Sequence, residues 1–175
     1  LSASITRAMQ EHQPAAYFAS GGTPWPQIRL KMENPDGKHS NTSIRFKEGM
    51  TEGLDISYDA GMLKHDPSFA LFTRMPGNND VDYTIQCLPD AYDRLIIPVG
   101  LNAPVGERIT FTAEGSNLPA DCHCFFEDRD AGCYLQLDTP GSFYSVTLTE
   151  QNMQSGNFYI HTSRNTPVTR ELRIP

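Results

Sequence analysis

Two aspartates and a tyrosine lie close together in residues 49–60 and could bind a cation or act as an acid–base pair. Asp55, Tyr58 and Asp59 follow Gly49 and Gly53 within one short polar segment. A cation would need further oxygen ligands, and the spacing provides no third or fourth one. Aspartates in turns accept hydrogen bonds from backbone N–H groups more often than they bind a cation, and glycines in the same turns often have positive φ. We therefore expect a structural loop in which Gly49 or Gly53 has positive φ and Asp55 or Asp59 accepts backbone hydrogen bonds.

The histidines give no catalytic pattern. His39, His65, His123 and His161 lie in different predicted turns and strands. The chain has no Gly-x-Ser-x-Gly segment and no His-Glu-x-x-His segment, which mark serine hydrolases and zinc proteases. We predict that the protein is not an enzyme and has no catalytic residues, metal or cofactor. A hydrolase with a triad assembled from distant residues is the weaker rival, because a triad is defined in space.

The cysteines leave two interpretations open. Cys122 and Cys124 share one face of a predicted strand, whereas His123 between them points to the opposite face. This separation argues against zinc, which needs a closed set of four Cys or His ligands. Cys133 follows a predicted turn, so it could form a hairpin disulfide with Cys122 or Cys124 in an oxidising compartment. The alternative is that these cysteines and Cys87 are buried free thiols.

Trp25 is the only tryptophan, and it follows Tyr17 and Phe18 in a segment rich in proline and glycine. Exposed aromatic rings of this kind can stack on the apolar faces of sugars, so Trp25 and Tyr17 are the candidate glycan contacts. The alternative is that the segment packs on the rest of the domain and covers a sheet edge. We favour this second interpretation and assign residues 1–26 to an N-terminal extension packing on the domain, with a short helix in residues 1–12.

Short segments with alternating apolar and polar residues make up most of residues 27–175. In residues 27–33, Ile28, Leu30 and Met32 alternate with polar side chains, which is typical of a half-buried strand. Further strands are predicted at 42–46, 67–75, 81–88, 94–101, 106–115, 121–137 (a hairpin), 142–149, 156–162 and 169–174. This spacing predicts an all-β fold, an antiparallel two-sheet β-sandwich that is jelly-roll-like. Pro98 predicts an edge or bulged strand. The inward aromatic residues are expected to be Phe46, Tyr83, Phe111 and Phe158.

Composition limits the partners. The net charge of −7 argues against nucleic-acid binding, and no apolar run is long enough for membrane insertion. The first residues lack an initiator methionine and the layout of a signal peptide. We therefore expect a processed product or a piece of a larger protein.

A longer pattern resembles a known family. The family's pattern is Phe-x-x-Gly-x-Thr-x-Gly-Phe-Asp-x-x-Tyr-Asp-Ala-x-Lys-Leu, and the matching residues here are Phe46, Gly49, Thr51, Gly53, Asp55, Tyr58, Asp59, Ala60 and Leu63. Leu54 and Met62 depart from it. Leu88-Pro89, Pro98-Val99-Gly100 and residues 106–110 correspond to later family segments. Residues 28–162 thus resemble the β-sandwich domain that precedes the C-terminal sorting domain in cargo proteins of the Bacteroidetes type IX secretion system.

The resemblance implies an extracellular or cell-surface setting and no catalytic residues. We accordingly expect a non-enzymatic structural or spacer domain of a larger secreted bacterial protein, with adhesive contacts as a further role. Its partners would be neighbouring domains of the same polypeptide, a surface glycan or the secretion machinery. The alternative is a carbohydrate-binding module of jelly-roll type, which predicts an exposed aromatic platform or a groove on one sheet.

Overall fold

The computed structural model describes residues 24–62, 68–75, 81–149 and 156–164. These residues form strands, turns and bends without a helix, which confirms the all-β prediction. The strands are β1 (Gln27–Glu33), β2 (His39–Phe46), β3 (Ala60–Gly61), β4 (Ala70–Thr73), β5 (Tyr83–Leu88), β6 (Leu95–Asn102), β7 (Arg108–Ser116), β8 (His123–Asp128), β9 (Cys133–Gln136), β10 (Tyr144–Thr147) and β11 (Phe158–Ser163). The helix expected in residues 1–12 and the strand expected at 169–174 lie outside the described residues.

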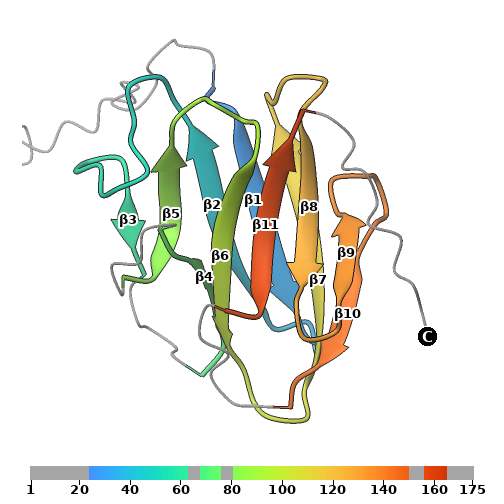
Figure 1. Ribbon diagram of the computed structural model, residues 1–175. Helices are drawn as coiled ribbons and strands as arrows, with labels where there is room; N and C mark the ends of the chain where they lie inside the picture. Colours follow the sequence, from blue (N-terminus) through green and yellow to red (C-terminus); the bar gives the residue numbers. More distant parts are fainter. Residues whose placement is uncertain (1–23, 63–67, 76–80, 150–155, 165–175) are drawn as a thin grey trace, which may run out of the picture.

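All these strands belong to one mixed sheet, which corrects the prediction of two antiparallel sheets. Hydrogen bonds connect the strands in the order β10-β7-β1-β2-β5-β4-β6-β11-β8-β9, and β3 joins β5 beside this path. Short strand β4 pairs with both β5 and β6, so the ladder continues from one layer into the next. The pair β2–β5 is parallel. Between them in the sequence come β3 and β4, which are both antiparallel to β5, so the chain enters β5 in the same direction as β2 (Figure 1). Apolar alternation reports which face is buried and carries no information on strand direction.

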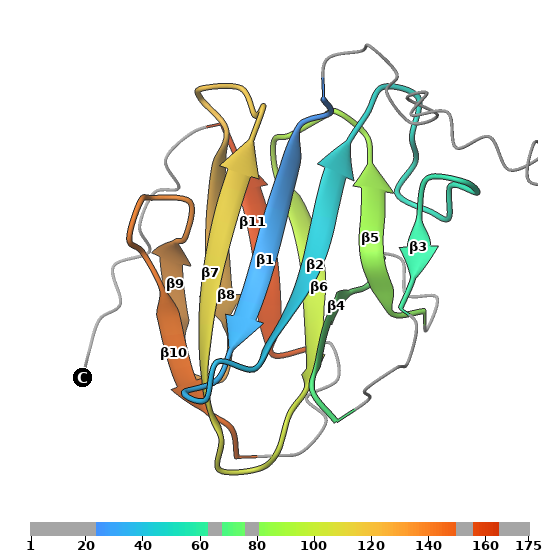
Figure 2. The same ribbon diagram turned by 180° about the vertical axis from the view of Figure 1, so that it is seen from behind.

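The sheet curls so that β1, β2 and β7 face β6, β8 and β11 across the core (Figures 1 and 2). Phe111 on β7 lies 4.8 Å from Phe126 and 5.4 Å from Phe158, measured between ring centroids. The expected inward rings Phe46, Tyr83, Phe111 and Phe158 are each at most 1% exposed, which confirms that they are buried. Phe46, Phe111 and Phe158 belong to the core between the layers, whereas Tyr83 is buried outside that cluster. Each such side chain contributes roughly 1.5–3 kcal/mol on burial.

Strand β6 lies inside the sheet, between β4 and β11, so the edge position expected from Pro98 is wrong. Proline has no N–H to donate to a ladder. The pairing of β4 with β6 ends at Thr73 opposite Val99. Just beyond it, the Pro98 carbonyl accepts a hydrogen bond from the Arg74 N–H at 3.0 Å. The proline therefore occupies the place where β6 needs an acceptor on that side and no donor.

The two aspartates of residues 49–60 hold the loop between β2 and β3. The Asp55 carboxylate accepts the Thr51 N–H at 2.7 Å, and the Asp59 carboxylate accepts the Asp55 N–H at 2.7 Å. The other Asp59 oxygen accepts the N–H of Cys87 on β5, also at 2.7 Å. Gly49 has φ 82°, in the left-handed region that favours glycine. These observations confirm the structural interpretation, with Gly49 as the glycine concerned, and show that Asp59 ties the loop to the sheet.

Replacing Asp59 with alanine should lower the free energy of unfolding by about 1–2 kcal/mol, because two backbone N–H groups lose their acceptor. Urea unfolding of the purified chain measures this change. Asp36→Ala is the control, since Asp36 is exposed in a turn and should have little effect. Equal stability of Asp59→Ala and the parent chain would remove the role assigned to this carboxylate.

Candidate functional site

The residues proposed from sequence as glycan contacts are only partly placed. Trp25 is 39% exposed, and its ring centroid lies 5.8 Å from that of Tyr58. The Lys47 ammonium lies 5.7 Å from the Trp25 centroid and 5.0 Å from the Tyr58 centroid. Tyr17 lies outside the described residues. Trp25 therefore has a cation and a second ring as neighbours, and its contact with a glycan stays a prediction.

The register of the β8–β9 hairpin rules out the hairpin disulfide that the sequence left open. Cys133 lies opposite Asp128, four residues along β8 from Cys124, which is about 13 Å at the rise of a strand. A disulfide requires Cα atoms within about 7 Å. All four cysteines are free thiols. Cys87, Cys122 and Cys124 are buried, as the alternative interpretation expected, whereas Cys133 is only half-buried. Burial raises the pKa of Cys87 and of Cys122 to about 11, so both are protonated and unreactive near neutral pH.

A cluster of aromatic and charged side chains occupies the outer face of β8, β9 and β11. Alternate residues of these strands, such as Phe126 and Phe158, point into the core, so their neighbours point outward. The register places His161 opposite Phe125, and Glu127 between Tyr159 and Tyr134. We call this cluster the aromatic face and define it as Phe125, Glu127, Arg129, Tyr134, Tyr159 and His161.

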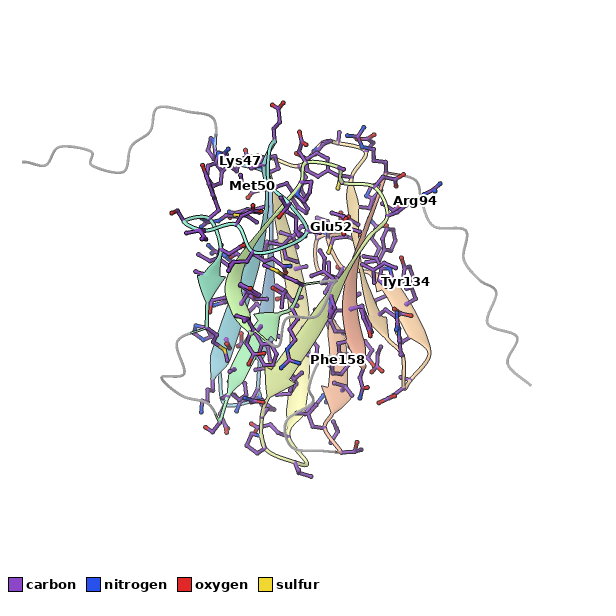
Figure 3. The ribbon with its side chains drawn as sticks, turned by 60° about the vertical axis from the view of Figure 1, so that its left-hand side comes forward. Lys47, Met50, Glu52, Arg94, Tyr134 and Phe158 are labelled. Atoms are coloured by element: carbon purple, nitrogen blue, oxygen red, sulfur yellow. The ribbon has the colours of Figure 1, made fainter. Side chains whose placement is uncertain are left out.

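The rings of the aromatic face are stacked on one another. Tyr134 lies nearly parallel to Phe125, with centroids 5.4 Å apart and planes at 13°. The His161 ring meets Tyr134 edge-on at 5.1 Å. Phe125 is 4% exposed, whereas Tyr134 is 41% exposed and lies on the outer side of the sheet, away from the core ring Phe158 (Figure 3). Tyr134 is thus a ring supported from below and open to solvent.

Charged groups lie beside the rings of the aromatic face. His161 Nε2 and Arg129 Nε lie 2.8 Å and 3.1 Å from the same Glu127 oxygen. The Arg129 guanidinium also covers the Tyr159 ring at 3.7 Å from its centroid. Burial raises the pKa of Glu127, but the hydrogen bonds and charges of His161 and Arg129 outweigh burial, and the pKa lies below its usual value. Glu127 is therefore ionised at neutral pH.

The aromatic face has the chemistry of a binding surface. An open ring such as Tyr134 can stack on an apolar sugar face, while Glu127 and Arg129 can exchange hydrogen bonds with hydroxyl groups. The His161–Glu127 pair resembles part of a catalytic triad, yet no hydroxyl or thiol of the described residues hydrogen-bonds to His161. Among these residues, no group of three or more His, Cys, Asp or Glu could hold a metal ion.

Sequence analysis missed this cluster because its members come from strands that are distant in sequence. The hairpin brings Tyr134 next to Glu127, but β11 joins β8 from about thirty residues further on. A partial signal exists in the alternation itself. In residues 123–127, the positions between the core residues are His, Phe and Glu, and in residues 159–161 they are Tyr and His.

No family model, curated protein or solved structure matches this chain. The resemblance described above therefore stays a prediction. No helix among the described residues is long and apolar enough to cross a membrane.

The stabilising role of Glu127 should depend on pH. Its folded-state pKa is lowered, so its contribution is present above the unfolded-state pKa of about 4.3 and is lost as the pH falls through the lower folded value. Glu127→Gln should therefore be less stable than the parent chain at pH 7, and this gap should close as the pH is lowered below about 4. Unfolding curves across pH measure the gap, with Glu114→Gln as control because Glu114 is an exposed residue of β7. A gap independent of pH would show that the ion pair contributes nothing.

Proposed function

We propose that the chain is a non-enzymatic structural domain of a larger secreted or cell-surface bacterial protein, in which it holds, spaces and presents neighbouring domains. The observation that carries this proposal is the burial of the large aromatic side chains. Phe46, Tyr83, Phe111 and Phe158 are at most 1% exposed, and three of them, Phe46, Phe111 and Phe158, belong to the core between the two layers. A scaffold needs a stable sheet more than a free surface, and buried rings provide that stability.

The candidate acid–base groups support the same proposal. Asp55 and Asp59 accept backbone N–H groups, so their oxygens serve the loop and the neighbouring strand. Glu127 is held between His161 and Arg129, which orients all three side chains on the outer face. These carboxylates act in the fold as hydrogen-bond acceptors and ion-pair partners.

The setting and partners of this domain belong to the proposal as well. The resemblance of residues 28–162 to domains of type IX secretion cargo supports an extracellular or cell-surface location. The partners would be neighbouring domains of the same polypeptide and the secretion machinery. A net charge of −7 fits partners other than nucleic acid, whose phosphates would repel this surface.

A structural role predicts that another domain can take its place. Replacing residues 24–164 in the larger protein with an unrelated β-sandwich of similar size should preserve export and the activity of the neighbouring domains. Secretion assays and neighbour activity, compared with a deletion of the same residues, measure this. Loss of export or of cell attachment in the replacement, reproduced by Tyr134→Ala alone, would contradict a purely structural role.

The aromatic face favours carbohydrate binding as a second candidate function. Tyr134 is 41% exposed and is stacked on Phe125. This open ring supports the candidate, because a carbohydrate-binding module needs exposed aromatic surface. Glu127 lies opposite Tyr134 in the register, and Arg129 lies beside Glu127. Both can bind hydroxyl groups. This face differs from the Trp25 region that the sequence suggested.

If the aromatic face binds a glycan, Tyr134→Ala should weaken binding about tenfold or more, since a stacked ring is worth roughly 1 kcal/mol beyond the area it buries. A glycan array with the purified chain, followed by titration of any positive glycan, measures the effect. Phe143→Ala is the control because Phe143 is 61% exposed and lies outside this face. Trp25→Ala tests the site suggested by sequence, and binding lost only in that variant would move the site to Trp25.

A further inference from the structure

Large apolar side chains are exposed together around the loop between β2 and β3. Ile56 is 81% exposed, Leu54 59%, Trp25 39% and Tyr58 36%. We call these four residues the apolar corner. In Figure 3 this loop is marked by Lys47, Met50 and Glu52, on the opposite side of the molecule from Tyr134. An exposed apolar group of this kind is typical of a contact surface.

The loop holds these side chains in place. The Asp55 and Asp59 carboxylates accept backbone N–H groups within the loop, and Asp59 also binds the Cys87 N–H. Ser57, between Ile56 and Tyr58, has φ 76°, a conformation that is unfavourable for a residue with a Cβ and that persists only where its surroundings fix it. Leu54 and Ile56 therefore cannot turn inward without breaking these bonds.

The sequence before Trp25 offers an apolar segment of matching size. Residues 15–19 read Ala-Ala-Tyr-Phe-Ala, between polar residues on one side and Gly21-Gly22 on the other. Trp25 belongs to the corner, so the preceding chain starts from this place. The eight residue-to-residue steps from Tyr17 to Trp25 span up to about 26–29 Å, and two glycines permit the chain to reverse direction.

We propose that Tyr17 and Phe18 dock on the apolar corner and cover Leu54, Ile56 and the Trp25 ring. The N-terminal segment is the occupant favoured here, because it is attached at the corner and carries apolar side chains of its own that can cover it. The contact would remove apolar surface from water on both sides. This inference is independent of the role proposed for the domain, since it concerns a contact within the chain.

Trp25 makes the contact measurable, because it is the only tryptophan and lies in the corner itself. In the full chain, the double variant Tyr17→Ser, Phe18→Ser should shift Trp25 fluorescence to longer wavelength and increase its quenching by acrylamide. Ile56→Ser should change both in the same direction, and the fold should tolerate it because Ile56 is 81% exposed. Val105→Ser is the control, since Val105 is 58% exposed in the turn between β6 and β7 and should leave both unchanged.

Two outcomes would overturn the proposal. Trp25 emission and quenching that stay unchanged in the double variant would show that Tyr17 and Phe18 do not cover the ring. Protection of Trp25 that disappears on dilution would show that a second copy of the chain covers the corner. Protection that is independent of protein concentration and lost in both variants would establish the contact.

Discussion

The fold depends on the contact of Phe111 with Phe126 and Phe158 across the core. The hydrogen-bonded path through the sheet begins at β10 and ends at β9, and these two end strands are not paired with each other. The sheet is therefore not closed by backbone hydrogen bonds. Side chains must therefore bring β7 against β8 and β11. The Tyr144 hydroxyl adds a polar link on the same side, donating to the buried Asp128 carboxylate at 2.5 Å. The curled shape is thus held on one side by hydrogen bonds through β4 and on the other by rings and one hydroxyl.

The same alternation that fills the core produces the aromatic face. Phe126 points inward, so Phe125 and Glu127 point outward on either side of it. Neighbouring strands then add Tyr134, Tyr159 and His161 at matching heights. The outer cluster is therefore a consequence of register, and the hydrogen bonds of Glu127 with His161 and Arg129 hold these side chains in one arrangement. A rigid surface of this kind loses little conformational entropy when it makes a contact.

Local features of the fold could be predicted from the sequence, whereas long-range ones could not. Period-two alternation located β1, β5, β7 and β11 and the buried positions of Phe46 and Phe111. Along a strand, the alternation of apolar and polar residues shows which side chains are buried. The aspartate loop followed from turn chemistry. Parallel pairing of β2 with β5 and the continuous path through β4 depend on how distant segments meet, and the alternation of each strand is compatible with either direction. The aromatic face was missed for the same reason, since Tyr134 and His161 become neighbours only through β8.

The first and last described strands are both internal in the sheet. β1 lies between β7 and β2, and β11 lies between β6 and β8, while the start of β1 and the end of β11 lie at the same end of the sheet (Figure 1). Tension applied between the two flanking segments would therefore act across the strands and load β1 and β11 from that one end, where hydrogen bonds open one after another. Each of these strands is held by a ladder on both sides, whereas a strand at an edge is held by one. Internal pairing thus gives both ends of the described fold more resistance to being peeled from the sheet than an edge position would.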